Sequence, residues 1–213
     1  MPRYYPIYLD IRDKKCIVVG GGDVAYRKAL SLKEAGAQVV VISPEISPEF
    51  LKEEGLTILQ QKYEDRCLEG ATLVIAATNE EEVNQRVWTE ASRHGLLVNV
   101  VDKPELCNFI VPSVVNRGEL QISISTGGAS PAFARRMRQE LENRYGPEYG
   151  EFIKLLSRLR PEVRSQIGEA SKRQRALERL SSPEMLDMIR TRGTAETEKE
   201  MRRIITEELG RSK

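Results

Sequence analysis

A run of glycines, from Gly20 to Gly22, joins a segment typical of a β-strand to one typical of an α-helix. Residues 16–19 are apolar and mostly β-branched, and apolar side chains recur at helical spacing over residues 24–35. With Ala25, the glycines form the pattern G-x-G-x-x-A, which in this strand–turn–helix setting predicts a dinucleotide-binding turn. Gly20 permits the tight turn, Gly22 lets the backbone approach a diphosphate, and Ala25 lets the helix pack close to the strand. A glycine-rich turn without a ligand is the alternative.

The first half of the chain alternates strand-like and helix-like patterns, which predicts a parallel sheet covered by helices. The fold class predicted for this half is α/β, with a Rossmann-type parallel sheet. Gly36 is expected to end the first helix, and the third strand is the weakest and is expected near the sheet edge. The expected strands cover residues 16–19, 39–42, 56–59, 73–77 and 97–101, and the expected helices cover residues 24–35 and 84–94.

The pattern changes in the second half. Apolar and polar residues alternate over residues 120–125, which predicts a half-exposed strand that follows a turn at 116–119. Ser130 and Pro131 suit the N-cap and the first position of a helix over residues 132–145.

The remainder, from Pro147, is typical of charged helices with breaks near Pro161 and Pro183. The predicted organisation is therefore a Rossmann-type domain over residues 1–112, a small α+β dimerisation segment over 113–146 and a C-terminal helical domain over 147–213.

Composition argues against several classes of function. The 33 basic and 32 acidic side chains give a net charge of +1, so no overall charge favours nucleic acid. The apolar runs are too short to span a bilayer and the N-terminal residues lack a signal-peptide core, so we expect no membrane partner and a cytoplasmic location. The three cysteines are widely spaced and the chain has one histidine, so we expect no resident metal site.

The second predicted strand ends at Ser43, where a dinucleotide-binding fold usually has an acidic residue that binds the adenosine ribose. A serine hydroxyl can also bind ribose, and no arginine sits beside it to receive a 2′-phosphate, which favours NAD over NADP. Thr78 leaves the fourth strand at the edge where open α/β sheets bind ligands, although a plain loop fits residues 76–79 nearly as well. The residues predicted to bind the cofactor are Gly20, Gly22, Asp23, Val24, Ala25, Ser43, Pro44 and Thr78.

Asp102 follows the fifth predicted strand and is expected near the nicotinamide, where a carboxylate can act as an acid or base; a turn former or helix cap is the alternative. Residues 125–128 precede the capped helix and are typical of an anion cradle made of backbone amides and hydroxyls. Three arginines follow on that helix, either as a solvated face or as a receiver for an acidic substrate: Arg135, Arg136 and Arg138. An apolar stripe on the same helix indicates a partner surface such as a second subunit: Phe133, Met137 and Leu141.

Taken together, these segments resemble the precorrin-2 dehydrogenase/sirohydrochlorin ferrochelatase module of siroheme synthases. The glycine turn alone is common to many enzymes, whereas the combination in this order is highly specific. The resemblance covers about residues 3 to 150 strongly and the helical remainder loosely. It is carried by residues 5–9, 18–29, 99–102 (Asn-Val-Val-Asp), 107–112 and 125–135.

The resemblance implies NAD-dependent removal of two hydrogens from precorrin-2 to give sirohydrochlorin. It implies a homodimer formed by the middle segment, with the active site between that segment and the nucleotide domain. Asp102 is then the catalytic residue, a general acid or base that also assists insertion of Fe²⁺ as a substrate. Thr126 stands where some members carry a phosphorylated serine. The residues implied to bind the acidic macrocycle are Asn99, Ser125, Thr126, Gly127, Gly128 and Arg135.

Other functions remain open at this point. Relatives of this size comprise dehydrogenases alone and dehydrogenases that also insert iron, and Asp102 fits both. The 213 residues leave no room for the methyltransferase domain of a full siroheme synthase, so we expect another protein to supply that methylation. A regulatory Rossmann protein that binds NAD without turnover is one alternative. A dehydrogenase of a small uncharged substrate is another, but it leaves residues 125–128 and the arginines without a purpose.

Overall fold

The computed structural model describes residues 4–210; residues 1–3 and 211–213, which the predicted domain limits include, lie outside the described residues. The chain separates into two compact units, Met1–Val111 and Pro112–Lys213, each with a hydrophobic core of its own. Between residues 4 and 210, no helix combines the length and the apolar character needed to cross a membrane.

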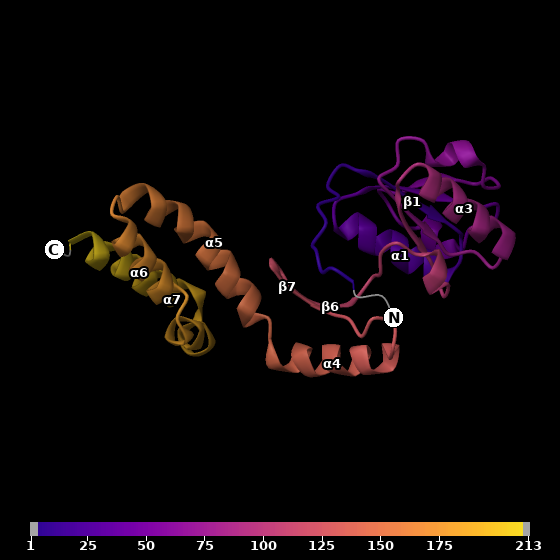
Figure 1. Cartoon of the computed structure of the whole chain (residues 1–213). Helices are drawn as coiled ribbons and strands as arrows, with labels where there is room; N and C mark the ends of the chain where they lie inside the picture. The colour runs from indigo at the N-terminus through magenta and orange to yellow at the C-terminus, as the bar shows by residue number, and fades with distance from the viewer. Residues whose placement is uncertain (1–3, 211–213) are drawn as a thin grey trace. The chain divides into compact units, whose positions relative to one another are not determined.

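The first unit is built on a five-stranded parallel sheet with the strand order β3-β2-β1-β4-β5 (Figure 1). This order confirms the predicted Rossmann-type α/β fold, and the weakest predicted strand, β3, lies at an edge. The register places Val18 of the central strand between Val41 and Ile75 of its two neighbours. The strands are β1 (Lys15–Val19), β2 (Gln38–Ile42), β3 (Thr57–Leu59), β4 (Leu73–Ala76) and β5 (Leu97–Val100).

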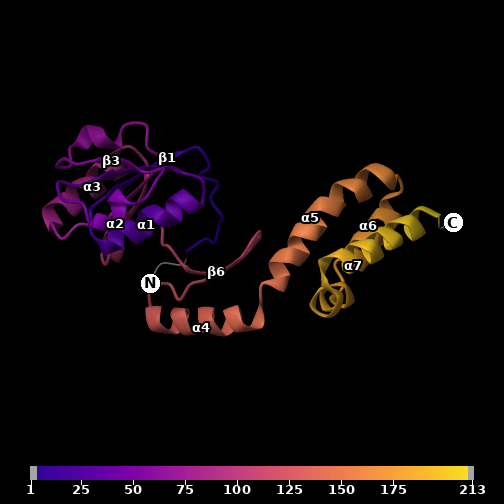
Figure 2. The same ribbon diagram turned by 180° about the vertical axis from the view of Figure 1, so that it is seen from behind.

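Helices cover both faces of this sheet: α1 (Asp23–Glu34), α2 (Pro48–Leu51) and α3 (Glu81–Arg93), with 3₁₀ turns over Asp65–Leu68 and Pro104–Leu106. Cys16 and Val18 pack in the core that contains α1 and α2, whereas Ile17 and Val19 pack in the core that contains α3. Figure 2 shows α1 and α2 on the same side of the sheet. Because both faces are covered, residues 16–19 of β1 form an unbroken apolar run that does not alternate with polar residues.

The ends of these elements follow local chemistry. Gly36, with a φ of 84°, comes directly after the C-cap residue Ala35 and ends α1 as expected. The sequence does not predict α2, because a single turn is too short to show a helical period.

The second unit begins with an antiparallel hairpin of β6 (Ser113–Arg117) and β7 (Leu120–Ile124), followed by α4 (Pro131–Arg144). The sequence predicts β7 but not β6. Arg117 still pairs with Leu120, so the turn is narrower than the expected 116–119. The predicted helix cap is confirmed, since the Phe133 N–H donates to Ser130 Oγ at 3.2 Å.

The rest of this unit is a helical core of α5 (Glu148–Gln166), α6 (Ala170–Leu180) and α7 (Pro183–Gly210). The break predicted near Pro161 is wrong, because Pro161 lies inside α5. The buried side chains of Leu159 and Val163 on either side of it offset the cost of an internal proline, about 3 kcal/mol. The break near Pro183 is confirmed, and α7 has an unpredicted kink at Gly193, whose φ is 81°.

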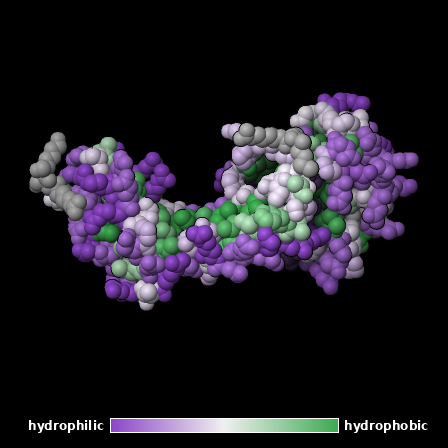
Figure 3. Space-filling model, turned by 60° about the horizontal axis from the view of Figure 1, so that its bottom comes forward, coloured by the Kyte–Doolittle hydropathy of each residue, from purple (hydrophilic) through white to green (hydrophobic). Residues whose placement is uncertain are grey.

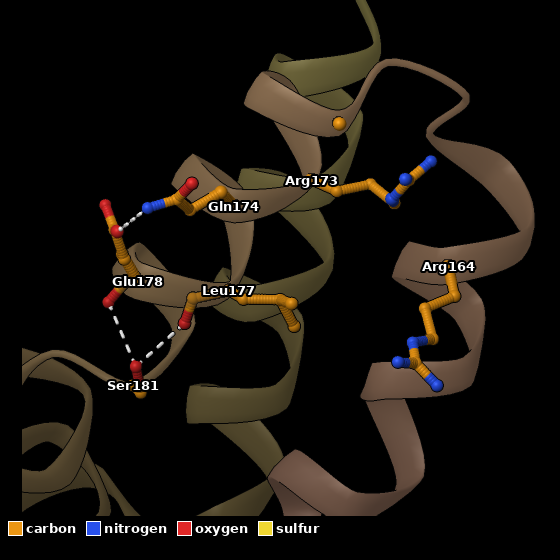
Figure 4. Close-up of a pocket in the computed structure, with 7 residues that line it drawn as sticks. Arg164, Arg173, Gln174, Leu177, Glu178 and Ser181 are labelled. Carbon is orange, nitrogen blue, oxygen red and sulfur yellow. Dashed lines mark hydrogen bonds between the residues drawn. The ribbon is translucent and has the colours of Figure 1, made fainter.

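A small cavity of about 370 Å³ lies between α5 and α6 (Figure 4). Arg164 from α5 and Arg173 from α6 both line it. Arg173 donates to the carbonyl oxygens of Ile167 at 3.0 Å and Gly168 at 2.7 Å, so its guanidinium satisfies the end of α5. None of the residues predicted to bind a ligand lines this cavity.

Candidate functional site

The turn between β1 and α1 is shaped by close backbone contacts. Gly20 has a φ of 132°, and a Cβ added there would lie 2.3 Å from the Ala77 carbonyl oxygen at the end of β4. Gly22 is the N-cap of α1, and a Cβ there would meet no atom within 4 Å. No side chain caps this helix, so its first N–H groups are available at the turn. A diphosphate-binding turn requires this geometry.

Gly21 has a role that the motif does not assign. A Cβ on Gly21 would lie 1.9 Å from the Glu45 carbonyl oxygen, and the Ser47 N–H donates to the Gly21 carbonyl at 2.9 Å. The segment after β2 therefore packs directly on the glycine turn. The pattern G-x-G-x-x-A leaves this position open, so only the fold reveals the constraint.

A cavity of about 900 Å³ opens at the carboxyl ends of β1, β2 and β4. Its volume is in the range of ligand pockets, roughly 300–1,000 Å³. Ala25, another predicted cofactor residue, is fully buried in the core between α1 and the sheet. The other predicted cofactor residues all line the cavity: Gly20, Gly22, Asp23, Val24, Ser43, Pro44 and Thr78.

Ser43 and Thr78 differ in how free their side chains are. Ser43 directly follows β2 and is 8% exposed, and its N–H donates to the Leu59 carbonyl at 3.2 Å. The Thr78 hydroxyl lies 2.9 Å from Asn84 Oδ1 and also accepts from the Glu80 N–H at 3.1 Å. Thr78 is thus already bonded to the start of α3, and its predicted contact with the cofactor rests on its position alone.

The cavity is also lined by residues that the sequence alone does not indicate as site residues. Lys62, Tyr63 and Arg86 line it together with Ser43, although they are distant in sequence. Arg86 Nη2 donates to Asp65 at 2.9 Å, and the Arg86 guanidinium carbon lies 5.6 Å from the centre of the Tyr63 ring. The expectation that no arginine lies beside Ser43 considers sequence neighbours only, whereas α3 brings Arg86 to the same cavity.

Tyr63 is unusual within this group. Its side chain is buried, and its hydroxyl has no hydrogen-bond partner among residues 4–210. Burial raises the pKa of Tyr63, so the hydroxyl remains a proton donor at neutral pH.

Asp102 lies in the turn that directly follows β5 and has a φ of 60°. A left-handed conformation costs a residue other than glycine about 1–3 kcal/mol and is common at functional sites. The side chain is exposed, and its carboxylate makes no hydrogen bond within the described part of the chain. Lys28 on α1 is half-buried; burial and Arg27 lower the pKa of Lys28, while the negative charge of Asp102 acts in the opposite direction.

Two other residues near Asp102 are already engaged. Asn99 Nδ2 donates to the Phe109 carbonyl at 3.0 Å, and no hydrogen bond to its amide oxygen is found among the described residues. Lys103 pairs with Glu81 at 2.6 Å, which raises the pKa of Lys103.

The predicted anion cradle lies in the second unit. Gly127 and Gly128 have φ values of 62° and 88°, which explains the paired glycines. Ser125 Oγ accepts from the Gly127 N–H and Thr126 Oγ1 accepts from the Ser130 N–H, both at 3.1 Å. The oxygen of each hydroxyl therefore accepts a hydrogen bond from the loop backbone, and its O–H group can still donate one to a ligand.

The arginines on α4 are not equivalent. Arg136 pairs with Glu140 at 3.4 Å, and Arg138 pairs with Glu142. Arg135 is exposed and makes no ion pair among the described residues. Over residues 4–210, no group of three or more His, Cys, Asp or Glu side chains is placed to hold a metal ion.

Three family models match consecutive parts of the chain. Residues 7–113 match a putative NAD(P)-binding family, residues 117–144 the sirohaem biosynthesis protein central region, and residues 148–205 the sirohaem synthase dimerisation region. The region named for dimerisation thus covers α5 to α7, whereas from the sequence we expect dimerisation at residues 113–146.

Two curated relatives are siroheme synthases. The chain is 42% identical over 171 residues to that of Methylobacillus flagellatus, covering 79% of this chain and 37% of the relative. It is 44% identical over 179 residues to that of Methylococcus capsulatus, covering 83% of this chain and 38% of the relative. The chain therefore spans less than two fifths of the length of these relatives.

The fold also matches a solved structure, SirC, a precorrin-2 dehydrogenase. The TM-score is 0.79 with 24% sequence identity, over 94% of this chain and 100% of that chain. With the three family models in this order along its length, the chain belongs to the family of NAD(P)-binding modules found in siroheme synthases.

Proposed function

We propose that the chain is a dehydrogenase that removes two hydrogens from precorrin-2, with a nicotinamide cofactor, to give sirohydrochlorin. The observation that carries the proposal is the cavity at the carboxyl edge of the sheet, which gathers the glycine turn, Ser43 and Thr78. The siroheme synthase relatives and the likeness to SirC, a precorrin-2 dehydrogenase, support the choice of substrate.

The residues of this cavity fit a dinucleotide. Gly22 faces open space, and the uncapped start of α1 offers N–H donors and the positive end of the helix dipole to a diphosphate. The neutral hydroxyl of Ser43 suits a ribose. When bound, the nicotinamide supplies the acceptor for the hydride that leaves the substrate.

Asp102 is proposed as the group that moves the proton. Removing two hydrogens from the macrocycle requires that a proton leave together with the hydride. The Asp102 carboxylate is exposed and free of hydrogen bonds to the described residues, so it can accept that proton. Lys28 on α1 lies close enough for the negative charge of Asp102 to act on it, so a cationic side chain is placed beside this carboxylate.

We propose NAD as the cofactor in preference to NADP. The guanidinium of Arg86 is already engaged by Asp65 and lies over Tyr63, and the same cavity is lined by the acidic residues Glu45 and Glu82. Acidic residues in the same cavity disfavour an added phosphate. A comparison of kcat/KM for the two cofactors tests this proposal, and a preference for NADP would overturn it.

The cradle of the second unit is proposed to bind the carboxylates of the macrocycle. The hydroxyls of Ser125 and Thr126 keep a proton to donate, and Arg135 has a guanidinium that no carboxylate of the described chain occupies. Substituting Arg135 with leucine is expected to raise the KM for the macrocycle and leave the KM for NAD unchanged.

We also propose that the protein is a homodimer. Figure 3 shows hydrophobic side chains gathered over the α4 and β6–β7 part of the second unit. Val114 and Phe133 are exposed there, and exposed apolar patches mark contact surfaces. The match to a dimerisation region supports the same proposal. Light scattering gives the mass directly, and a monomeric mass at micromolar concentration would contradict it.

Insertion of Fe²⁺ into sirohydrochlorin stays a prediction, as does the cytoplasmic location. In this proposal iron is a substrate, and the Asp102 carboxylate provides an oxygen atom that can bind Fe²⁺. Adding Fe²⁺ to sirohydrochlorin with the wild-type protein and with Asp102→Ala separates one activity from two.

The proposed dehydrogenation is tested with purified protein, precorrin-2 and NAD, by following the absorbance of the oxidised macrocycle and of the reduced nicotinamide. We expect both to rise together. Binding of NAD without any spectral change would overturn the proposal and favour a regulatory protein.

A further inference from the structure

β5 is at the edge of the sheet, and the chain that follows returns along its free side. The Asn108 N–H donates to the Val98 carbonyl at 3.0 Å, and Asn108 Oδ1 accepts from the Val98 N–H at 2.8 Å. Asn108 Nδ2 donates to the Leu96 carbonyl at 2.8 Å. A single asparagine thus takes the place of a neighbouring strand beside Leu96 and Val98.

Cys107 extends this contact to the turn that carries Asp102. The Val100 N–H donates to Cys107 Sγ at 3.2 Å. The same sulfur lies 3.3 Å from the Val100 carbonyl oxygen and 3.2 Å from that of Lys103, so the thiol proton is shared between these acceptors. The Lys103 N–H donates to the Val100 carbonyl at 3.2 Å and closes the turn. One sulfur therefore contacts both ends of the turn in which Asp102 lies.

The conformation of Asp102 needs such support. Its φ of 60° costs about 1–3 kcal/mol and persists only where the surroundings hold it. Burial raises the pKa of the Cys107 thiol, so the sulfur stays protonated near neutral pH and keeps its donor. The contacts of the turn are therefore maintained in the pH range in which a carboxylate base works.

We propose that Cys107 is a positioning residue, whose thiol holds the Val100–Lys103 turn and thereby the direction in which Asp102 presents its carboxylate. The proposal rests on the proposed role of Asp102 in proton transfer. Sulfur suits the task because its contacts here are 3.2–3.3 Å long, whereas O–H···O bonds are roughly 2.5–3.0 Å. A serine is too short to keep all of them, and an alanine leaves the Val100 N–H without a partner.

Simple packing is the competing explanation, since Cys107 is half-buried beside the core that contains α3. Cys107→Val fills the space and cannot hydrogen-bond, and Cys107→Ser hydrogen-bonds but fills less space. The two variants therefore separate the explanations. Cys67, a half-buried thiol in the same unit, supplies the matched control Cys67→Val.

Steady-state kinetics with precorrin-2 and NAD provides the first readout. For Cys107→Val we expect kcat to fall about tenfold, a part of the roughly 10²–10⁴-fold that a placed acid or base contributes. The KM for NAD should stay unchanged, because the glycine turn lies between β1 and α1 and Cys107 contacts the turn after β5 instead. Cys107→Ser should recover part of the loss, and Cys67→Val should match the wild type. A wild-type kcat in Cys107→Val overturns the proposal. If Cys107→Ser, which fills less space, then has a lower kcat than Cys107→Val, packing is the explanation.

Amide hydrogen exchange at Val100 and Lys103 provides a second readout that needs no activity. We expect faster exchange in Cys107→Val and in Cys107→Ala than in the wild type, with partial protection in Cys107→Ser. If the wild type does not oxidise precorrin-2, the proposed function fails, while this exchange pattern still decides whether Cys107 holds the turn. Equal exchange in the wild type and Cys107→Val overturns the role of Cys107.

Discussion

Gly21 and Glu45 are in such close contact that a Cβ on the glycine would lie 1.9 Å from the glutamate carbonyl oxygen. This contact joins the glycine turn between β1 and α1 to the segment after β2, and both line the same cavity. The proposed cofactor site is therefore built from backbone packed on backbone, and side chains complete it.

Gly21→Ala and Gly22→Ala form a matched pair that tests this arrangement. Gly21→Ala must displace the Glu45 segment, so we expect a lower Tm and weaker NAD binding. Gly22→Ala meets no protein atom within 4 Å, so its Tm should stay near that of the wild type while its methyl group hinders the diphosphate. Thermal unfolding and calorimetric titration with NAD measure the two effects. Equal Tm values for the two variants would contradict the account.

Tyr63→Phe tests the unpaired hydroxyl in the cavity. A buried hydroxyl without a partner costs about 1–3 kcal/mol, so removing it should leave the free energy of unfolding unchanged or raise it by about 1 kcal/mol. The variant should bind NAD more weakly if the hydroxyl donates to the cofactor. Urea unfolding provides the first value; a clear loss of stability would mean that the hydroxyl has a partner in solution.

Glu208→Ala tests the helical core of the second unit. Glu208 is fully buried and accepts from Arg179 at 2.9 Å and from Arg175 at 3.4 Å. Breaking a buried pair costs about 3–5 kcal/mol, and we expect the lower value because both arginines remain partly exposed. The control is Glu196→Ala, an exposed partner of Lys199 that should change stability by less than about 1 kcal/mol. Similar losses in both variants would contradict the prediction.

Glu53→Gln tests the pH dependence of the ion pair between Lys33 on α1 and Glu53, which follows α2. Lys33 holds the pKa of Glu53 below its usual value, so the contact stabilises the fold above the pKa of an unfolded glutamate, roughly 4.3. This stabilisation is lost as the pH falls through the lower pKa of the folded state. The variant should be less stable than the wild type at neutral pH, and the difference should shrink in acid. Glu54→Gln is the control; a difference that stays constant with pH would refute the assignment.

The sequence predicts the sheet well because its inner strands β1 and β4 are buried on both faces and appear as separate apolar runs. Asp102 and the glycine turn are predicted as candidate site residues for a related reason, since each comes at the carboxyl end of a strand. Gly21, Tyr63 and Arg86 are not found, because their roles depend on segments that only the fold brings together.

Errors in the second unit have a similar origin. Pro161 is compatible with α5 because buried side chains on both sides hold the helix, which local propensity does not show. β6 depends on its pairing with β7, so its residues carry little strand signal of their own.

Asp102→Asn tests whether this carboxylate accepts the proton, in a single-turnover reaction with precorrin-2 and NAD. The wild type should form one reduced nicotinamide for each sirohydrochlorin. The variant should bind NAD with an unchanged Kd, because the glycine turn is intact, and should lose roughly 10²-fold or more of the rate. A wild-type rate in Asp102→Asn, with precorrin-2 still oxidised, would contradict the proposed role of Asp102.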